Sequence, residues 1–342
     1  MVEGIKALLL EEYTLEQWAL AFFLYSFAGW CWEVMLSLVL RHRFVNRGFL
    51  TGPILPIYGF GALTILIVCV PVKDSVLRIA LLGAVAATAL EYVTGAAMEA
   101  LFHVRYWDYS NARFNVHGYI CAKSTAVWAL FSALIVRLVH PFVRQVVQMI
   151  PTGFSMVLAG AFTAFALADT ASAVRRALDL RALLMSMERY AKELEALHGG
   201  LDSVADRVAD MIKAFARTVD ARHEEAAQRL ASMNEARERI AQQIRERRIT
   251  LEEGTKERFA AFEHALTGIA DLTPDALNLH EELRAIKEKY DRQAEILRAA
   301  RERRLARARK VLHRNPSAAS RRYSRSFEAL RDEEESERKT KR

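Results

Sequence analysis

Residues 18–40 read WALAFFLYSFAGWCWEVMLSLVL, and Glu33 is the one charged residue among them. The hydrocarbon core of a bilayer is about 30 Å thick, and a helix rises about 1.5 Å per residue. About 20 mostly apolar residues can therefore cross it while every backbone hydrogen bond stays within the helix. This stretch predicts a transmembrane helix.

Four more apolar stretches follow along the chain. They are residues 54–70, 76–102, 119–139 and 152–173. The second is the shortest and follows Pro53, and proline suits the first turn of a helix. The sequence therefore predicts an all-α polytopic membrane domain over residues 1–173, with about five transmembrane helices.

The density of charge changes sharply after this domain. Residues 1–172 carry 11 Lys and Arg with 10 Asp and Glu, whereas residues 173–342 carry 37 and 31. About 25% of the residues of an average soluble domain are charged, so the first half is too apolar to be soluble. The second half is too charged for a membrane, and residues 174–314 predict a long cytoplasmic helical or coiled-coil region.

Helix breakers divide this charged region. Gly199-Gly200 and residues 271–274 are predicted to supply the turns of a helical hairpin. We expect the region to pack on itself or to form homo-oligomers, with docking of a separate partner as the alternative. Residues 315–342 are expected to be mostly disordered, apart from a helix near residues 327–335.

Basic residues are concentrated at positions 298–314, where Glu302 is the one acid. Anionic lipid attracts such segments, and nucleic acid is the other usual partner of a basic helix. The chain carries no nucleic-acid recognition motif, and no aromatic residue interleaves with these basic ones. Membrane lipid is the predicted partner, and nucleic acid is not.

The distribution of arginine indicates an orientation. Cytoplasmic loops are richer in Lys and Arg. The loops after the first and third predicted spans, and the segment after the fifth, hold more of them than the segments on the other side. We expect a cell-membrane protein with its N-terminus outside and its C-terminal half in the cytoplasm.

The two arginine-containing loops resemble each other. RFVNRGFLTG at 43–52 aligns with RFNVHGYICA at 113–122, and each follows a Gly-x-x-x-Glu pattern that ends at Glu33 or Glu99. The alignment pairs Arg47 with His117, Gly48 with Gly118, and Phe49 with Tyr119. Transporters are often built from repeats with a binding site between the copies, so we expect Arg47 and His117 to face Glu33, Glu91 or an anionic headgroup. The alternative is that these loops are tight interfacial turns.

Four acids lie in or near the ends of the predicted spans: Glu33, Glu91, Glu99 and Asp169. A charge in the membrane faces a partner or a wet cavity and often marks a site. For Glu33 and Glu91 we favour a cavity that binds a substrate headgroup or relays protons. For Glu99 and Asp169 we favour pairing with loop arginines.

Two motifs carry a resemblance to a known family. The first is Gly29-Trp30-x-Trp32-Glu33 followed by NRGFLTGPILPIYGFG at 46–61, and the second is spread over residues 91–121 as Glu91-Tyr92, Glu99, WDYS at 107–110, Asn115 and Gly118-x-Ile120-Cys121. Residues 18–135 thereby resemble the putative ABC-transporter permease family (CmpB-like, ABC-transporter type IV). The resemblance implies a bacterial multi-pass membrane protein related to transport, with no established substrate or catalytic residue to carry over.

These patterns together define a predicted polar site for a substrate or for structural pairing. Its members are Glu33, Asn46, Arg47, Gly48, Glu91, Glu99, Trp107, Asp108, Tyr109, Asn115, His117 and Gly118. The histidines lack a ligand partner at helical spacing, so no metal and no cofactor is predicted.

The sequence leaves alternative functions open. It contains no G-x-x-x-x-G-K-[ST] and no catalytic motif. The main hypothesis is a transport-related permease subunit without an ATPase of its own, which would need a separate ATPase subunit. The alternative is a membrane-anchored scaffold or sensor that acts through its cytoplasmic helices. An enzyme of lipid headgroups, with Glu33 or Glu91 as acid or base, is the least favoured.

Overall fold

A computed structural model describes residues 13–42, 44–216, 228, 235, 255–257, 259–260, 263 and 274–340. Within these ranges the regular structure is helical, and the predicted all-α membrane protein is confirmed. The elements are α2 (Leu15–Arg41), α3 (Pro56–Cys69), η1 (Val70–Val72), α4 (Val76–Phe102), α5 (Ala122–Leu134), η2 (Ile135–Val139), α6 (His140–Gln148), α7 (Thr152–Ala216), α10 (Pro274–Arg314) and α11 (Ser324–Thr340).

Four helical segments in the described part of the chain are long and apolar enough to cross a membrane: α2, α4, the continuous run from α5 to α6, and the first part of α7. The second predicted span, residues 54–70, corresponds to the shorter apolar helix Pro56–Val72. The fourth and fifth spans continue beyond their predicted ends, to Gln148 and Ala216.

The ends of these helices follow from local side-chain chemistry. Thr14 and Gln17 form a capping box at the start of α2, and Pro56 opens α3. His42 and His103 end α2 and α4 in the left-handed conformation, with φ of 50° and 57°. A left-handed residue at a helix end lets its N–H bond a carbonyl of the last turn.

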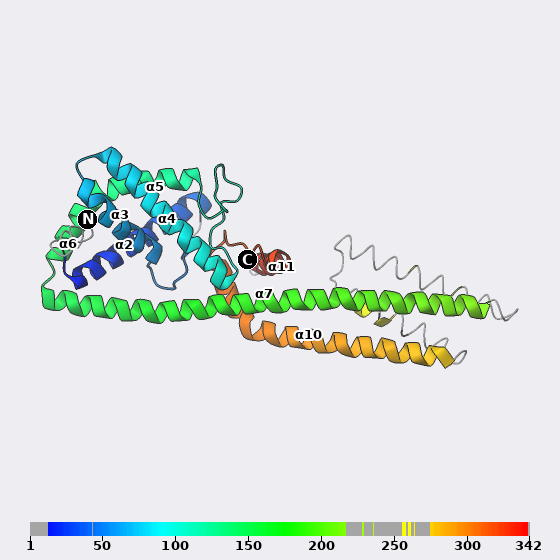
Figure 1. Cartoon of the computed structure of the whole chain (residues 1–342). Coiled ribbons are helices and arrows are strands. Elements are labelled where there is room, and N and C mark those ends of the chain that lie inside the picture. The colour runs from blue at the N-terminus through cyan, green and yellow to red at the C-terminus, as the bar shows by residue number, and fades with distance from the viewer. Residues whose placement is uncertain are drawn as a thin grey trace. The chain divides into compact units, whose positions relative to one another are not determined.

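The bundle has an apolar core built mainly from α2, α3, α4 and α6. Small residues let the helices approach closely: a Cβ on Gly83 of α4 would lie 2.2 Å from the Ser132 Oγ of α5. Figure 1 shows α2 to α6 gathered beside the first part of α7. Leu66, Ile65 and Cys69 of α3 are fully buried, so the shortest membrane helix lies at the centre of the packing.

The described residues form two compact units. One comprises those of 1–185 together with 303–342, and the other those of 186–302. In the second unit, Arg207 of α7 pairs with Glu282 of α10. The predicted turn at Gly199-Gly200 is wrong, because α7 runs through both glycines. Each glycine costs only about 1 kcal/mol relative to alanine, and the flanking residues are strong helix formers.

The C-terminal segment differs from its predicted disorder. Residues 315–340 are described and include α11, which begins before and ends after the predicted helix at 327–335. Phe327 and Leu330 are buried, so α11 has an apolar face that packs on the first unit.

The basic cluster at 298–314 also makes contacts within the first unit. Arg304 and Arg307 pair with Asp179 of α7, and Arg309 pairs with Glu333 of α11. These arginines therefore have protein partners, which could not be predicted from the sequence because the acids lie far away along the chain.

Candidate functional site

The polar centre of the membrane domain begins at Glu33, near the end of α2. The Arg47 guanidinium donates to one Glu33 oxygen at 2.7 Å, and the Tyr58 hydroxyl of α3 donates to the other at 2.7 Å. The Glu33 and Arg47 side chains are each 22% exposed. The half-buried Glu33 carboxylate accepts one charged and one neutral donor. It is compatible with the membrane because the adjacent Arg47 guanidinium balances its charge.

The loop that carries Arg47 is shaped by its neighbours. Trp30 donates its indole N–H to Asn46 Oδ1 at 2.8 Å, and Asn46 Nδ2 donates to the Thr51 carbonyl at 2.9 Å. Gly48 has φ of 120°, a conformation that L side chains avoid. Asn46 and Gly48 therefore fix the path of the chain that aims Arg47 at Glu33.

Glu91 is the most deeply buried acid of α4, at 7% exposure. The Trp128 indole donates to one of its oxygens at 3.0 Å, and the Tyr109 hydroxyl donates to the other at 3.3 Å. None of the ion pairs among the described residues involves Glu91. A carboxyl group so placed is held by neutral donors alone.

Aromatic residues connect Glu33 to Glu91. The Tyr58 and Trp128 rings, which bond Glu33 and Glu91 respectively, lie 6.1 Å apart between centroids. Burial raises the pKa of Tyr109 well above its usual value, and the nearby Glu91 and Glu33 carboxylates add to the shift. The structure thus brings these two predicted site residues into one polar cluster with Tyr58, Trp128 and Tyr109.

A second carboxylate centre lies at the end of α4. Glu99 accepts from Arg105 Nε at 2.6 Å and from the Tyr119 hydroxyl at 2.5 Å. The Arg105 side chain is 2% exposed, also pairs with Asp108 at 3.2 Å, and lies 4.5 Å above the Tyr119 ring. Two acids therefore neutralise a fully buried arginine.

Asp108 is held as an anion by this arrangement. Burial acts to raise its pKa, but hydrogen bonds from Ser110 and the charge of Arg105 outweigh that effect and keep the pKa below its usual value. Gly118, with φ of 76°, packs on the same group: a Cβ there would lie 2.5 Å from Arg105 Nη1 and 2.7 Å from Asp108 Oδ1. The positive φ favours glycine at this position, and an added Cβ would also displace these side-chain ends.

The remaining predicted residues hold the second loop in shape. Trp107 donates to the Tyr119 carbonyl at 2.9 Å, and Asn115 bonds the Ala112 carbonyl and the Gly118 N–H. His117 lies 3.1 Å from the Tyr92 hydroxyl. It contacts neither Glu33 nor Glu91, in contrast to the sequence expectation, because its loop folds toward the Tyr92 side of α4.

The two centres repeat one arrangement. In each, a glycine lies one helical turn before the glutamate and faces the tyrosine that donates to that glutamate. A Cβ on Gly29 would lie 2.3 Å from Tyr58 Cγ, and a Cβ on Gly95 would lie 3.1 Å from Tyr119 Cδ1. The corresponding pairs are therefore Arg47 with Arg105 and Tyr58 with Tyr119. This correspondence by contact differs from the sequence alignment, which pairs Arg47 with His117 and Phe49 with Tyr119; common ancestry of the two loops stays a prediction.

One known family resembles the membrane domain. Residues 20–174 match the family model described as putative ABC-transporter type IV. The resemblance drawn from the sequence is confirmed, and the match extends from residue 135 through the first part of α7. The family supports a transport-related membrane protein. No curated protein and no solved structure matches the chain.

Asp169 anchors the first loop of the membrane domain to α7. Its Oδ2 accepts the backbone N–H groups of Thr51 and Gly52, both at 2.7 Å. Arg176, two turns on, lies 3.7 Å from Asp169 Oδ1 and donates to Thr51 Oγ1 at 2.8 Å. Asp169 thus pairs with an arginine of its own helix, and its main partners are backbone amides of the loop.

The C-terminal segment binds both loops at the same end of the bundle (Figure 1). Arg314 donates to the Leu50 and Thr51 carbonyls, while Ala319 and Arg105 exchange two backbone hydrogen bonds of 2.8 and 3.0 Å. Ser320 donates to the His103 carbonyl at 2.6 Å. We call residues 314–322 the clasp, and the sequence analysis missed it because short polar segments carry no periodic signal.

The part of the chain that the structure describes offers no group of three or more His, Cys, Asp and Glu that could hold a metal ion. Cys31, Cys69 and Cys121 are free thiols.

Proposed function

We propose that this chain is a membrane permease subunit of a transport system. Its polar cluster of Glu33, Arg47, Tyr58 and Glu91 binds a polar group of the substrate or passes a proton. The observation that carries the proposal is Glu91, which is 7% exposed within a membrane helix and bonded only by neutral donors. Buried ionisable groups of this kind mark substrate and proton pathways in membrane proteins.

The remaining predicted site residues have supporting roles in this proposal. Asn46 and Gly48 set the position of Arg47, and the second centre of Glu99, Arg105 and Asp108 holds the second loop rigid. The second loop in turn supplies Tyr109, which donates to Glu91.

The orientation and the energy source complete the proposal. The end of the bundle that carries both loops also carries the arginines of the clasp, which favours placing it in the cytoplasm. With no nucleotide-binding loop in the sequence, ATP hydrolysis comes from a separate ATPase subunit.

Purification of the full chain from its native membranes, followed by mass spectrometry, tests the proposal. We expect an ABC-type ATPase to co-purify with the wild type and with Glu91→Gln, and the ATPase activity of the complex to fall at least tenfold in Glu91→Gln. Asp74→Asn, an exposed acid beyond η1, is the matched control and should change little. Absence of an ATPase, or full activity of Glu91→Gln, contradicts the proposal.

A second candidate function is that of a membrane-anchored scaffold or sensor, and one observation favours it. Residues 186–302 join two segments that both bind the loop around Thr51: α7, through Asp169 and Arg176, and the clasp, through Arg314. A partner or a second copy bound to these helices could thereby act on the loop that holds Arg47.

A chain in which a flexible Gly-Ser linker replaces residues 186–302 separates the two functions. A short linker can join residue 185 to residue 303, because the segments on either side of the deletion already lie close together: Asp179 pairs with Arg304 and Arg307. A permease subunit keeps its ATPase partner and basal activity in this variant. A scaffold loses its binding partners, and both outcomes are read from the same purification.

A further inference from the structure

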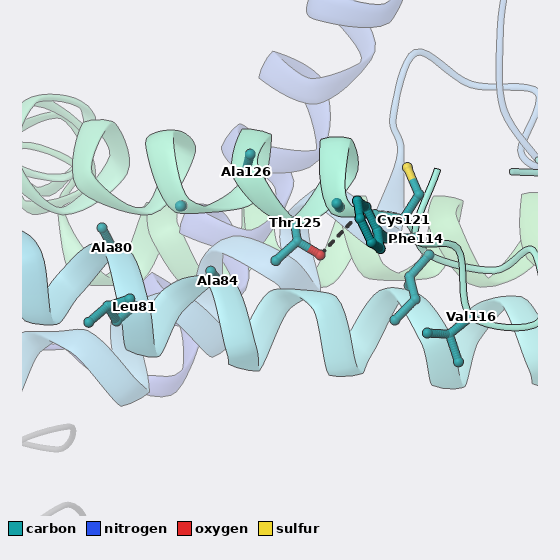
Figure 2. A pocket seen from close by; sticks show the side chains of 11 residues that line it. Ala80, Leu81, Ala84, Phe114, Val116, Cys121, Thr125 and Ala126 are labelled. Carbon is teal, nitrogen blue, oxygen red and sulfur yellow. Dashed lines mark hydrogen bonds between the residues drawn. The ribbon is translucent and has the colours of Figure 1, made fainter. Parts of the chain in front are cut away.

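An apolar groove lies between α4 and α5 and is closed at one end by the second loop (Figure 2). Its volume is about 430 Å³, within the range of small-molecule sites of about 300–1,000 Å³. Alanines of the two facing helices form its floor, and Phe114 and Val116 of the loop form its end. The lining residues are Ala80, Leu81, Ala84, Phe114, Val116, Ile120, Cys121, Ala122, Thr125, Ala126 and Ala129.

The groove opens toward the hydrocarbon. Both α4 and α5 belong to candidate membrane spans, and Leu81 on its edge is 60% exposed. From Ala122 to Ala129 the groove follows α5 for about 10 Å at about 1.5 Å per residue. A long, shallow, apolar channel of this kind matches the shape of an extended hydrocarbon chain.

Phe114 is held at the loop end of the groove by the conformation of its loop. It has φ of 53° and is 85% exposed, and the next residue, Asn115, bonds the Ser110 and Ala112 carbonyls. A bulky residue is strained at positive φ. An exposed phenyl ring fixed in this way is unfavourable in water but suits the interface between headgroups and acyl chains.

Two cationic residues are adjacent in the chain to residues that line this end of the groove. Arg113 precedes Phe114, and Lys123 follows Ala122; both are exposed. Neither makes an ion pair or a side-chain hydrogen bond within the described part of the chain. The arginines of the clasp, by contrast, bond protein groups. Free positive charge thus lies at the polar end of an otherwise apolar groove.

We propose that this groove binds an anionic phospholipid, with one acyl chain along Ala84 and Ala126 and the headgroup phosphate at Arg113 and Lys123. The charge is what selects the ligand. A zwitterionic lipid offers the same acyl chain but less net attraction, and each cation near an anionic surface contributes about fivefold in affinity. The site is separate from the polar cluster of the proposed function.

Native mass spectrometry of the full chain, released from nanodiscs into detergent, tests this site. The nanodiscs contain equal amounts of dioleoylphosphatidylglycerol and dioleoylphosphatidylcholine. We expect phosphatidylglycerol to be retained at least fivefold over phosphatidylcholine. Ala126→Leu fills the groove and should lower retention about tenfold, whereas Ala164→Leu, on an exposed face of α7, should not.

Charge variants test the headgroup separately. The double variant Arg113→Gln, Lys123→Gln should lose the preference for phosphatidylglycerol while keeping some acyl binding, and Arg78→Gln at the other end of α4 is the control. Ala122→Leu replaces Ala126→Leu if the latter does not purify as a folded protein. The proposal is overturned if the wild type retains the two lipids equally, or if Ala126→Leu retains as much phosphatidylglycerol as the wild type. So would a dimer that Ala126→Leu dissociates, since a second copy would then occupy the groove.

Discussion

The Tyr58 hydroxyl donates a 2.7 Å hydrogen bond to Glu33, while the tyrosine ring lies against Gly29, one helical turn before that glutamate. The glycine makes room for the ring, and the ring brings its hydroxyl to the carboxylate. The same relationship recurs between Tyr119 and Glu99. In both places the Gly-x-x-x-Glu pattern of a membrane helix is met by a tyrosine, Tyr58 of α3 in the first and Tyr119 of the loop before α5 in the second.

The packing of Tyr58 on Gly29 predicts that Gly29→Ala destabilises the protein by about 1–3 kcal/mol, the usual cost of overpacking. The added methyl group would lie 2.5 Å from Tyr58 Cβ, close to the backbone, so rotation of the ring cannot relieve the clash. Gly160→Ala is the control, because its Cβ meets nothing within 4 Å. Thermal unfolding in detergent, monitored by tryptophan fluorescence, gives the unfolding temperatures of the two variants. Equal unfolding temperatures for Gly29→Ala and Gly160→Ala would contradict the packing of Tyr58 on Gly29.

The pairing of Glu33 with Arg47 predicts a measurable coupling energy. We expect a double-mutant cycle with Glu33→Gln and Arg47→Gln to give about 1–2 kcal/mol, because the pair is partly buried and charge-assisted. The exposed Arg207–Glu282 pair is the comparison and should give a smaller coupling energy, because solvent screens it. A coupling at Glu33 no larger than that of the exposed pair would show that the two side chains are not held together.

Gly118 is predicted to be irreplaceable by alanine. Alanine there would adopt φ of 76° and would place its Cβ 2.5 Å from Arg105 Nη1. Left-handed backbone alone costs about 1–2 kcal/mol, and displacing the buried arginine adds to it. We expect Gly118→Ala to be destabilised by more than about 2 kcal/mol in chemical unfolding, with Gly153→Ala as the unhindered control.

His103 gives the clasp a pH dependence. Burial lowers its pKa, and the nearby Arg181 and Arg322 lower it further, against the opposing effect of Glu99. Because the folded protein binds this proton less tightly than the unfolded chain, its stability should fall as the pH drops through the usual histidine range near about 6.5. His103→Gln should flatten the pH dependence of the unfolding temperature between pH 5 and 7.5. If the slope is unchanged in this variant, another group causes the pH dependence.

The orientation can be tested by cysteine labelling in a background without Cys31, Cys69 and Cys121. Phe44→Cys lies on the loop side and Lys73→Cys at the opposite end of α3, and both side chains are exposed. We expect an impermeant maleimide to label position 73 in intact cells and position 44 only after permeabilisation. The reverse pattern would place the loops and the clasp outside.

The sequence by itself determined the helices of the membrane domain and its resemblance to a family. Apolar runs such as 76–102 are long enough that only a helix can satisfy their backbone groups in lipid, so α4 has the predicted ends. The acids Glu33 and Glu91 were recognisable for the same reason, because charge within such a run is costly and needs a partner.

The sequence also indicated Arg47 as a partner of Glu33, but only the tertiary structure decided which aromatic residues bond those acids. Tyr58 and Trp128 reach Glu33 and Glu91 from other helices, and the clasp reaches the loops from more than 200 residues away. Periodicity reports which face of a helix is apolar, but it carries no information on which distant segment covers that face. That choice rests on side-chain shape and hydrogen-bond direction, as in the fit of Tyr58 over Gly29, and these exist only once the helices are packed.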